Sequence, residues 1–124
     1  MSTTTQFEKQ SYLNLQTFRK NGAGVKTPVW FVQEDGALFV VTEASSGKVK
    51  RIRGNARVQI APCKGNGDLL GEWVDASARA INDDAVKRKV NRLMNQKYGL
   101  MKFMFDLMAK FQRSQRTVIE IKAG

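Results

Sequence analysis

The sequence contains no histidine and only one cysteine, Cys63, among its 124 residues. Without histidine, the chain can form no Cys/His zinc site and has no imidazole to activate a serine or cysteine nucleophile. A single cysteine cannot form an internal disulfide. Because Cys63 follows Pro62 near the end of an expected strand, we interpret it as a packed and inert thiol. Several classes of zinc-dependent and nucleophilic enzyme are thereby excluded.

The carboxylates do not form a catalytic set either. They occur mainly in expected turns and at an expected helix start, where turn and capping roles explain them. They include Glu34, Asp35, Asp68, Asp83 and Asp84. If the protein is an enzyme, its chemistry therefore belongs to a bound cofactor that the protein holds and orients. We expect no catalytic side chain and no metal site.

The chain also lacks a long hydrophobic run, and we expect no N-terminal leader. Its apolar runs are shorter than the roughly 20 residues of a membrane-spanning helix. Residues 1–10 lack the cationic start and apolar stretch of a signal peptide, so we expect a cytoplasmic protein. With 124 residues, of which 42% are hydrophobic and 26% are charged, a single domain over residues 1–124 is expected.

Negative charge is scarce. The 21 lysines and arginines outnumber the 11 aspartates and glutamates, which gives a formal net charge of +10. This excess attracts anionic partners over long range, whether nucleic acid, an anionic membrane surface or an anionic small molecule. Charge alone does not choose among the three.

What the sequence does contain is a series of alternating apolar segments separated by glycine-containing turns. These segments predict strands at residues 12–19, 25–33, 37–42, 56–63, 69–81 and 117–121. Because no helix of crossover length separates the first three, they indicate an antiparallel barrel. Pro28 cannot donate to a strand ladder, so it indicates an edge or a local distortion in the second strand.

Two helices are expected before the last strand. The spacing of apolar residues predicts the first at residues 83–98, with Asp83 and Asp84 at its start and Gly99 at its end. The second is expected at residues 100–112, where methionine, leucine and phenylalanine cover more of the circumference than one core-facing stripe needs. That excess favours a subunit partner, an apolar substrate pocket or a membrane surface.

Residues 42–58, TEASSGKVKRIRGNARV, concentrate hydroxyl groups and cations. The hydroxyl residues are followed by Gly47, and then by five cations with no acidic residue among them: Lys48, Lys50, Arg51, Arg53 and Arg57. Such a turn leading into a short basic helix can hold a phosphate, since amides at the helix start point at the anion and the cations supply charge. A solvated basic helix between two strands would explain the same composition.

Several segments, taken in order, resemble one known family. They are TPVWFV (27–32), EDGALFVV (34–41), the segment 42–58, APC (61–63), GEWVDASARAI (71–81), KYG (97–99) and TVIEI (117–121). Together they are similar to the pyridoxamine 5'-phosphate oxidase-like split-barrel superfamily. Within it they most resemble the small deazaflavin-dependent oxidoreductases, which use coenzyme F-420. The likeness extends over nearly the whole chain.

The resemblance implies a mainly β fold, a split antiparallel barrel of the FMN-binding type. A short basic helix would follow the third strand, and two helices would precede the last. It also implies a homodimer with coenzyme F-420, or else FMN, in a groove where two subunits meet. By this resemblance the cofactor phosphate is held by Thr42, Ser46, Lys48 and Lys50, and the ring system lies along Pro28, Val29 and Trp30. Gly47 is expected at the phosphate as well, because a glycine lets the backbone come close to a ligand.

Two positions depart from the family pattern. Relatives that bind FMN place an arginine before the phosphate-binding lysine, where this chain has Gly47, and a proline where it has Ala56. The first departure weighs against FMN.

The expected activity is that of an oxidoreductase that transfers a hydride to or from a small apolar or aromatic substrate. Two alternatives stay open. One is a basic barrel that binds nucleic acid, against which the lack of aromatic residues in the basic segment counts. The other is a cofactor carrier or haem binder of the same fold, without turnover.

Overall fold

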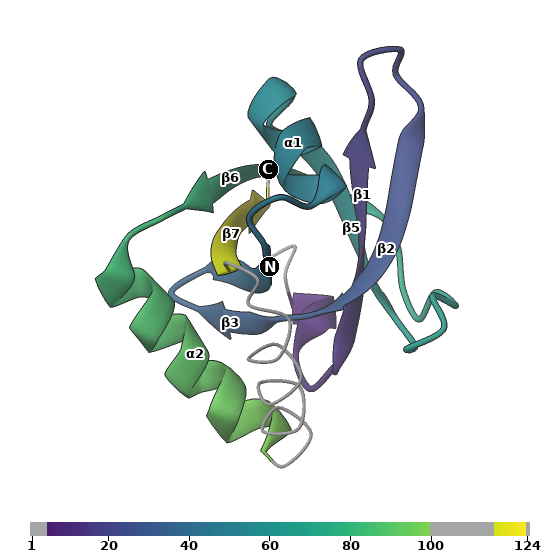
Figure 1. Cartoon of the computed structure of the whole chain (residues 1–124). Helices are drawn as coiled ribbons and strands as arrows, with labels where there is room; N and C mark the ends of the chain where they lie inside the picture. Colours follow the sequence, from purple (N-terminus) through teal and green to yellow (C-terminus); the bar gives the residue numbers. More distant parts are fainter. Residues whose placement is uncertain (1–4, 100–115, 124) are drawn as a thin grey trace.

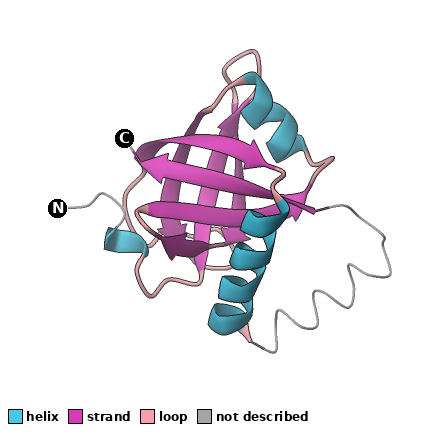
Figure 2. Cartoon of the chain, turned by 90° about the vertical axis from the view of Figure 1, so that its left-hand side faces the viewer, coloured by secondary structure: helices cyan, strands magenta, loops and turns pink. Residues whose placement is uncertain are grey.

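The computed structural model describes residues 5–99 and 116–123, and it shows an antiparallel sheet that curls into a barrel (Figure 1, Figure 2). The strands are β1 (Tyr12–Phe18), β2 (Gly24–Trp30), β3 (Val32–Glu34), β4 (Ala37–Glu43), β5 (Arg57–Cys63), β6 (Val74–Ile81) and β7 (Arg116–Ala123). The helices within these ranges are η1 (Thr5–Phe7), a 3-10 helix, and the α-helices α1 (Gly47–Gly54) and α2 (Asp84–Tyr98). The strand order is β2-β1-β5-β6-β7-β4-β3, with each described pair antiparallel. The expected split antiparallel barrel is confirmed.

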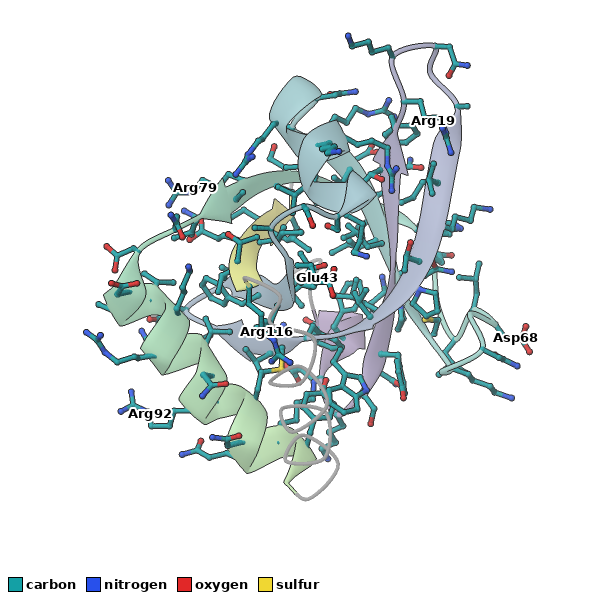
Figure 3. All side chains as sticks on the ribbon, in the orientation of Figure 1. Arg19, Glu43, Asp68, Arg79, Arg92 and Arg116 are labelled. Atoms are coloured by element: carbon teal, nitrogen blue, oxygen red, sulfur yellow. The ribbon has the colours of Figure 1, made fainter. Side chains whose placement is uncertain are left out.

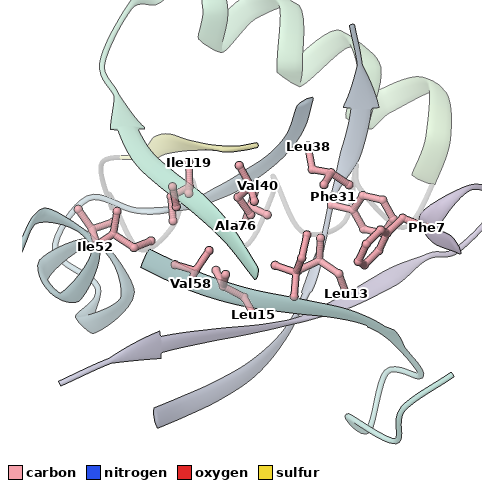
Figure 4. Close-up of a cluster of buried hydrophobic side chains, with 14 residues drawn as sticks. Phe7, Leu13, Leu15, Phe31, Leu38, Val40, Ile52, Val58, Ala76 and Ile119 are labelled. Carbon is pink, nitrogen blue, oxygen red and sulfur yellow. The ribbon is translucent and has the colours of Figure 1, made fainter. Parts of the chain in front are cut away.

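The interior of the barrel holds a hydrophobic cluster that runs from α1 to η1 (Figure 4). Alternate residues of β1, Leu13 and Leu15, point into it and are fully buried. Ile52 of α1 closes one end of the cluster. At the other end the rings of Phe7 and Phe31 meet edge to face, with centroids 6.0 Å apart. Helix α1 therefore covers one mouth of the barrel, and its polar side chains lie at the rim.

Helix α2 lies on the outside of the barrel, against β3 and β7 (Figure 2). Asp83 caps its start, because Oδ1 accepts hydrogen bonds from the backbone N–H groups of residues 85 and 86 at 2.8 and 3.2 Å. Gly99, with a φ of 55°, ends it. The helix expected at residues 83–98 is thus confirmed. It encloses a second hydrophobic cluster, formed by Val32, Val90, Met94 and Val118.

The single strand expected at residues 25–33 is wrong, since it is divided into β2 and β3 at Phe31. The hydroxyl of Tyr98 lies 2.9 Å from the backbone nitrogen of Phe31 and 2.7 Å from its carbonyl oxygen. Phe31 therefore directs its backbone groups to a side chain rather than to a ladder. Pro28 lies on an edge strand as expected, because β2 is the last strand on its side of the sheet. The basic helix consequently follows the fourth strand rather than the third.

The strand expected at residues 69–81 begins only at Val74. Before it, the structure has an isolated bridge between Cys63 and Leu69. The side chain of Gln6 donates to the carbonyl of Glu72 at 2.8 Å and accepts from its N–H at 3.1 Å. The side chain of Gln6 thus forms the hydrogen bonds that a neighbouring strand would otherwise form with the backbone of Glu72.

The second helix expected, at residues 100–112, lies outside the described residues. None of the helices in the described ranges is long and apolar enough to cross a membrane.

Candidate anion-binding site

The start of helix α1 combines a hydroxyl cap with outward-directed backbone donors. Ser46 is the N-cap residue, and its Oγ accepts a hydrogen bond from the backbone N–H of Val49 at 3.4 Å. Thr42, near the end of β4, donates to the same oxygen at 3.5 Å. The backbone N–H groups of Gly47 and Lys48 donate to no acceptor in the part of the chain that the structure describes. Such amides carry the positive end of the helix dipole and favour an anion.

Lys48 lies half-buried in this first turn. Burial lowers the pKa of its ammonium, the nearby charge of Arg51 lowers it further, and the carboxylate of Glu43 partly offsets both effects. Glu43 lies close to the start of the helix (Figure 3). Because the two cations repel each other in a partly desolvated place, an anion bound beside them would stabilise both charges.

Arg51, one turn further along α1, is fixed by a residue that is distant in sequence. Its Nε donates to the hydroxyl of Thr17 at 2.6 Å, and Thr17 is buried near the end of β1. Residues three apart in a helix are neighbours on its surface, so Arg51 shares a face with Lys48. Arg51 was counted among the cations of the segment but not predicted as a ligand. Its spacing from Lys48 was the signal available in the sequence.

Four of the five residues expected at the cofactor phosphate come together at this helix start: Thr42, Ser46, Gly47 and Lys48. Lys50, the fifth, does not join them. Lys50 is two residues after Lys48, so on an α-helix the two side chains point in directions roughly 160° apart. Lys50 is exposed to solvent.

The residues expected along the cofactor ring system lie on edge strand β2. Pro28 is opposite Asn14 of β1, and Val29 packs against the barrel core. The ring of Trp30 stacks on Tyr98, with centroids 4.5 Å apart and an angle of 9° between the planes. One face of Trp30 is therefore covered at the C-terminal end of α2, which lies at the opposite end of the molecule from α1 in Figure 1.

Lys97 forms a further cluster beside this stack. Its Nζ donates to the carbonyl oxygen of Phe31 at 2.8 Å and lies 3.6 Å from the centroid of the Phe31 ring. Although Lys97 as a whole is exposed, burial of the ammonium group lowers its pKa to about 8. Burial raises the pKa of Tyr98 to about 12, against the opposing effect of its hydrogen bond to Phe31. The sequence pattern did not indicate either shift, because both depend on Phe31, more than 60 residues away.

Cys63 is buried at the end of β5. Burial raises the pKa of its thiol, so the thiol stays protonated near neutral pH. Such surroundings are typical of a packed thiol rather than of a nucleophile.

Solved structures with the same fold include proteins of different kinds. The haem storage protein HutZ of Vibrio cholerae is 17% identical, with a TM-score of 0.72 over 94% of this chain and 84% of that chain. The conserved hypothetical protein Rv2991 of Mycobacterium tuberculosis is 20% identical, with a TM-score of 0.70 over 95% and 76% of the two chains. An F-420 reductase is 16% identical, with a TM-score of 0.62 over 98% and 92%. At these identities the likeness shows the fold alone.

No curated protein matches the chain in sequence. The family model described as pyridoxamine 5'-phosphate oxidase, however, matches residues 3–124. That range takes in both the barrel strands and the basic helix α1. The chain therefore belongs to the pyridoxamine 5'-phosphate oxidase family.

Proposed function

We propose that this protein is an oxidoreductase that binds the deazaflavin coenzyme F-420, with FMN as the second choice. It transfers a hydride to or from a small apolar or aromatic substrate. The observation that carries the proposal is the pair of cations, Lys48 and Arg51, at the Ser46-capped start of α1. Family membership and the structural likeness to an F-420 reductase support this class of cofactor.

The residues at the helix start fit a phosphate group. The amides of Gly47 and Lys48 and the hydroxyl of Ser46 offer neutral donors, while the side chains of Lys48 and Arg51 offer charged ones. A phosphate held here would fix a flavin-like molecule relative to the rim of the barrel. When bound, the deazaflavin or flavin supplies the hydride chemistry. The residues of the chain bind and orient it.

The surroundings of the site also suit an acidic extension on the cofactor. Arg19, in the connection between β1 and β2, lies at the same end of the molecule as α1 (Figure 3). Helix α1 itself carries the exposed cations Lys50 and Arg53. A basic rim of this kind attracts the polyglutamate tail of coenzyme F-420, which FMN lacks. For this reason we propose the deazaflavin rather than FMN as the cofactor.

The proposal includes a homodimer with the cofactor in a groove between two subunits. Among the described strands, β2 pairs only with β1, so the proposal puts the second copy at the other side of β2. Pro28, Val29 and Trp30 lie on this strand. A second subunit would complete the ring-binding part of the site, while the phosphate-binding part belongs to one chain.

A nucleic-acid-binding barrel has less support. Cations of the chain itself cover two aromatic rings: Arg57 lies 5.1 Å from the centroid of Phe18, and Lys26 lies 5.5 Å from that of Trp73. Bases stack on open aromatic faces, whereas Phe18 and Trp73 each have a face covered by a cation of the chain itself. A cofactor carrier remains the second candidate, because a haem storage protein shares the fold.

Titration of the purified protein with coenzyme F-420, FMN and a single-stranded oligonucleotide tests the proposal. Each would be added alone at fixed salt and followed by fluorescence. Saturable binding of coenzyme F-420 or FMN supports the proposal, whereas binding of the oligonucleotide alone would contradict it. If the reduced coenzyme binds but no electron-poor aromatic acceptor reoxidises it, the carrier is the better description.

A further inference from the structure

The backbone conformation at position 47 does not require a glycine. Its φ does not lie in the left-handed region that favours glycine, and alanine is normally the better residue in a helix. The surroundings give the reason instead. A Cβ at position 47 would lie 2.7 Å from Nη1 of Arg51 and 3.4 Å from its Cζ. The guanidinium of Arg51 therefore occupies the space in which a side chain of residue 47 would begin.

The guanidinium is not free to move aside. Its Nε donates to Thr17 at 2.6 Å, and Thr17 is only 1% exposed. Because the guanidinium is planar and rigid, fixing Nε also fixes the direction of Nη1 and Nη2. These two nitrogens face the first turn of α1. They donate to no acceptor among residues 5–99 and 116–123, and they lie 2.7 and 3.5 Å from the place that a Cβ on Gly47 would take.

We propose that Arg51 is a phosphate ligand of this chain, and that residue 47 is glycine because the guanidinium takes the place of a side chain there. The identity of the ligand, the phosphate ester of a flavin-like cofactor, rests on the proposed function. Lys48 supplies a point charge, whereas Arg51 supplies a planar fork that can donate twice. Together they orient the phosphate as well as attract it. Thr17 is a positioning residue, because it acts through Arg51.

Inorganic phosphate is the probe, followed by NMR through the Nε–H signal of Arg51 and the amide signal of residue 47. Three substitutions disturb the same guanidinium: Arg51→Ala removes it, Gly47→Ala displaces it and Thr17→Val releases it. Arg51→Ala should weaken phosphate binding by about tenfold to a hundredfold. The double variant Gly47→Ala/Arg51→Ala should bind no more weakly than Arg51→Ala alone, because both changes act on one group.

Gly47→Ala separates binding from folding. It should change the melting temperature little, since the helical preference of alanine offsets the loss of the hydrogen bond between Arg51 and Thr17, and yet weaken phosphate binding severalfold. The inference is overturned if Gly47→Ala binds phosphate as the wild type does, or if the two single effects add fully in the double variant. It is also overturned if phosphate shifts neither signal in the wild type. If phosphate binds as expected but coenzyme F-420 and FMN do not, the proposed function fails and the role of Arg51 stands.

Discussion

The hydroxyl of Tyr98 accepts a hydrogen bond of 2.9 Å from the backbone N–H of Phe31, 67 residues earlier in the chain. The same hydroxyl lies 2.7 Å from the carbonyl oxygen of Phe31 and 2.8 Å from that of Ser11, and its one hydrogen can be donated to either. Phe31 is the residue at which the chain passes from β2 to β3, the strands at the two opposite ends of the strand order. A single side chain at the end of α2 thus binds the backbone where this division between β2 and β3 occurs.

Tyr98→Phe should lower the free energy of unfolding by about 1–3 kcal/mol, because it leaves a buried backbone N–H without its acceptor. Chemical denaturation measures this. Tyr12→Phe is the matched control, since the Tyr12 hydroxyl forms no hydrogen bond with the described residues. Equal losses of unfolding free energy in the two variants would show that the hydrogen bond to Phe31 does not contribute to stability.

Lys97 should titrate with a pKa of about 8 when its side-chain signals are followed by NMR. An unfolded lysine titrates near 10.4, so between about 8 and 10.4 the unfolded chain binds more protons at this position than the folded one. The contribution of Lys97 to stability therefore rises with pH across that window. Lys97→Met should remove this rise. A titration midpoint above 10 would refute the burial of the ammonium group.

Cys63→Ser should retain most of the turnover of reduced coenzyme F-420. The thiol is buried and stays protonated at neutral pH, and hydride transfer is the chemistry of the cofactor. Turnover, cofactor affinity and melting temperature would be measured together. If turnover were abolished while the other two stayed intact, a thiol-dependent mechanism would have to replace the one proposed.

The protein should sediment as a dimer at micromolar concentration. The cofactor groove of the proposal needs two subunits, and the apolar residues at positions 100–112 exceed what a chain of 124 residues is expected to cover alone. Analytical ultracentrifugation at several concentrations measures the mass. A monomer at every concentration would contradict both the dimer and the shared groove.

The parts of the fold that depend on local chemistry could be predicted from the sequence. Helix α2 begins at Asp83 and ends at Gly99, because a carboxylate cap and a glycine with positive φ act on neighbouring residues. Strand β1 follows from the alternation of its own side chains. The interruption at Phe31 could not be predicted, since it depends on a hydroxyl 67 residues away. The late start of β6 likewise depends on Gln6, which is 66 residues from Glu72.

In the candidate site, too, features that depend on neighbouring residues could be predicted, and features that depend on distant residues could not. The cap at Ser46 and the charge of Lys48 could be predicted, because they lie within one short segment. The role proposed for Arg51 could not be predicted from the sequence, because it depends on the position of Thr17, 34 residues earlier. Helical spacing indicates only that Arg51 and Lys48 share a face of the helix. Lys50 was expected among the ligands from the family resemblance. The helix turns it away from Lys48.

The central claim is that Lys48 is the main phosphate ligand of a bound cofactor. Lys48→Ala should weaken the binding of coenzyme F-420 by roughly tenfold to a hundredfold at low salt, because a charge-assisted contact contributes roughly 1.5–3 kcal/mol. Since the pKa of Lys48 is lowered, wild-type affinity should also begin to fall at a lower pH than for an ordinary lysine.

The most direct measurement is a fluorescence titration of Lys48→Ala and Lys64→Ala with coenzyme F-420 at one salt concentration. Lys64 is exposed and lies in the turn after β5, so its substitution removes the same formal charge outside the site. We predict a large loss of affinity for Lys48→Ala and nearly wild-type affinity for Lys64→Ala. Equal losses in the two variants would contradict this prediction, because the positive charge would then act as a diffuse field rather than as a binding site.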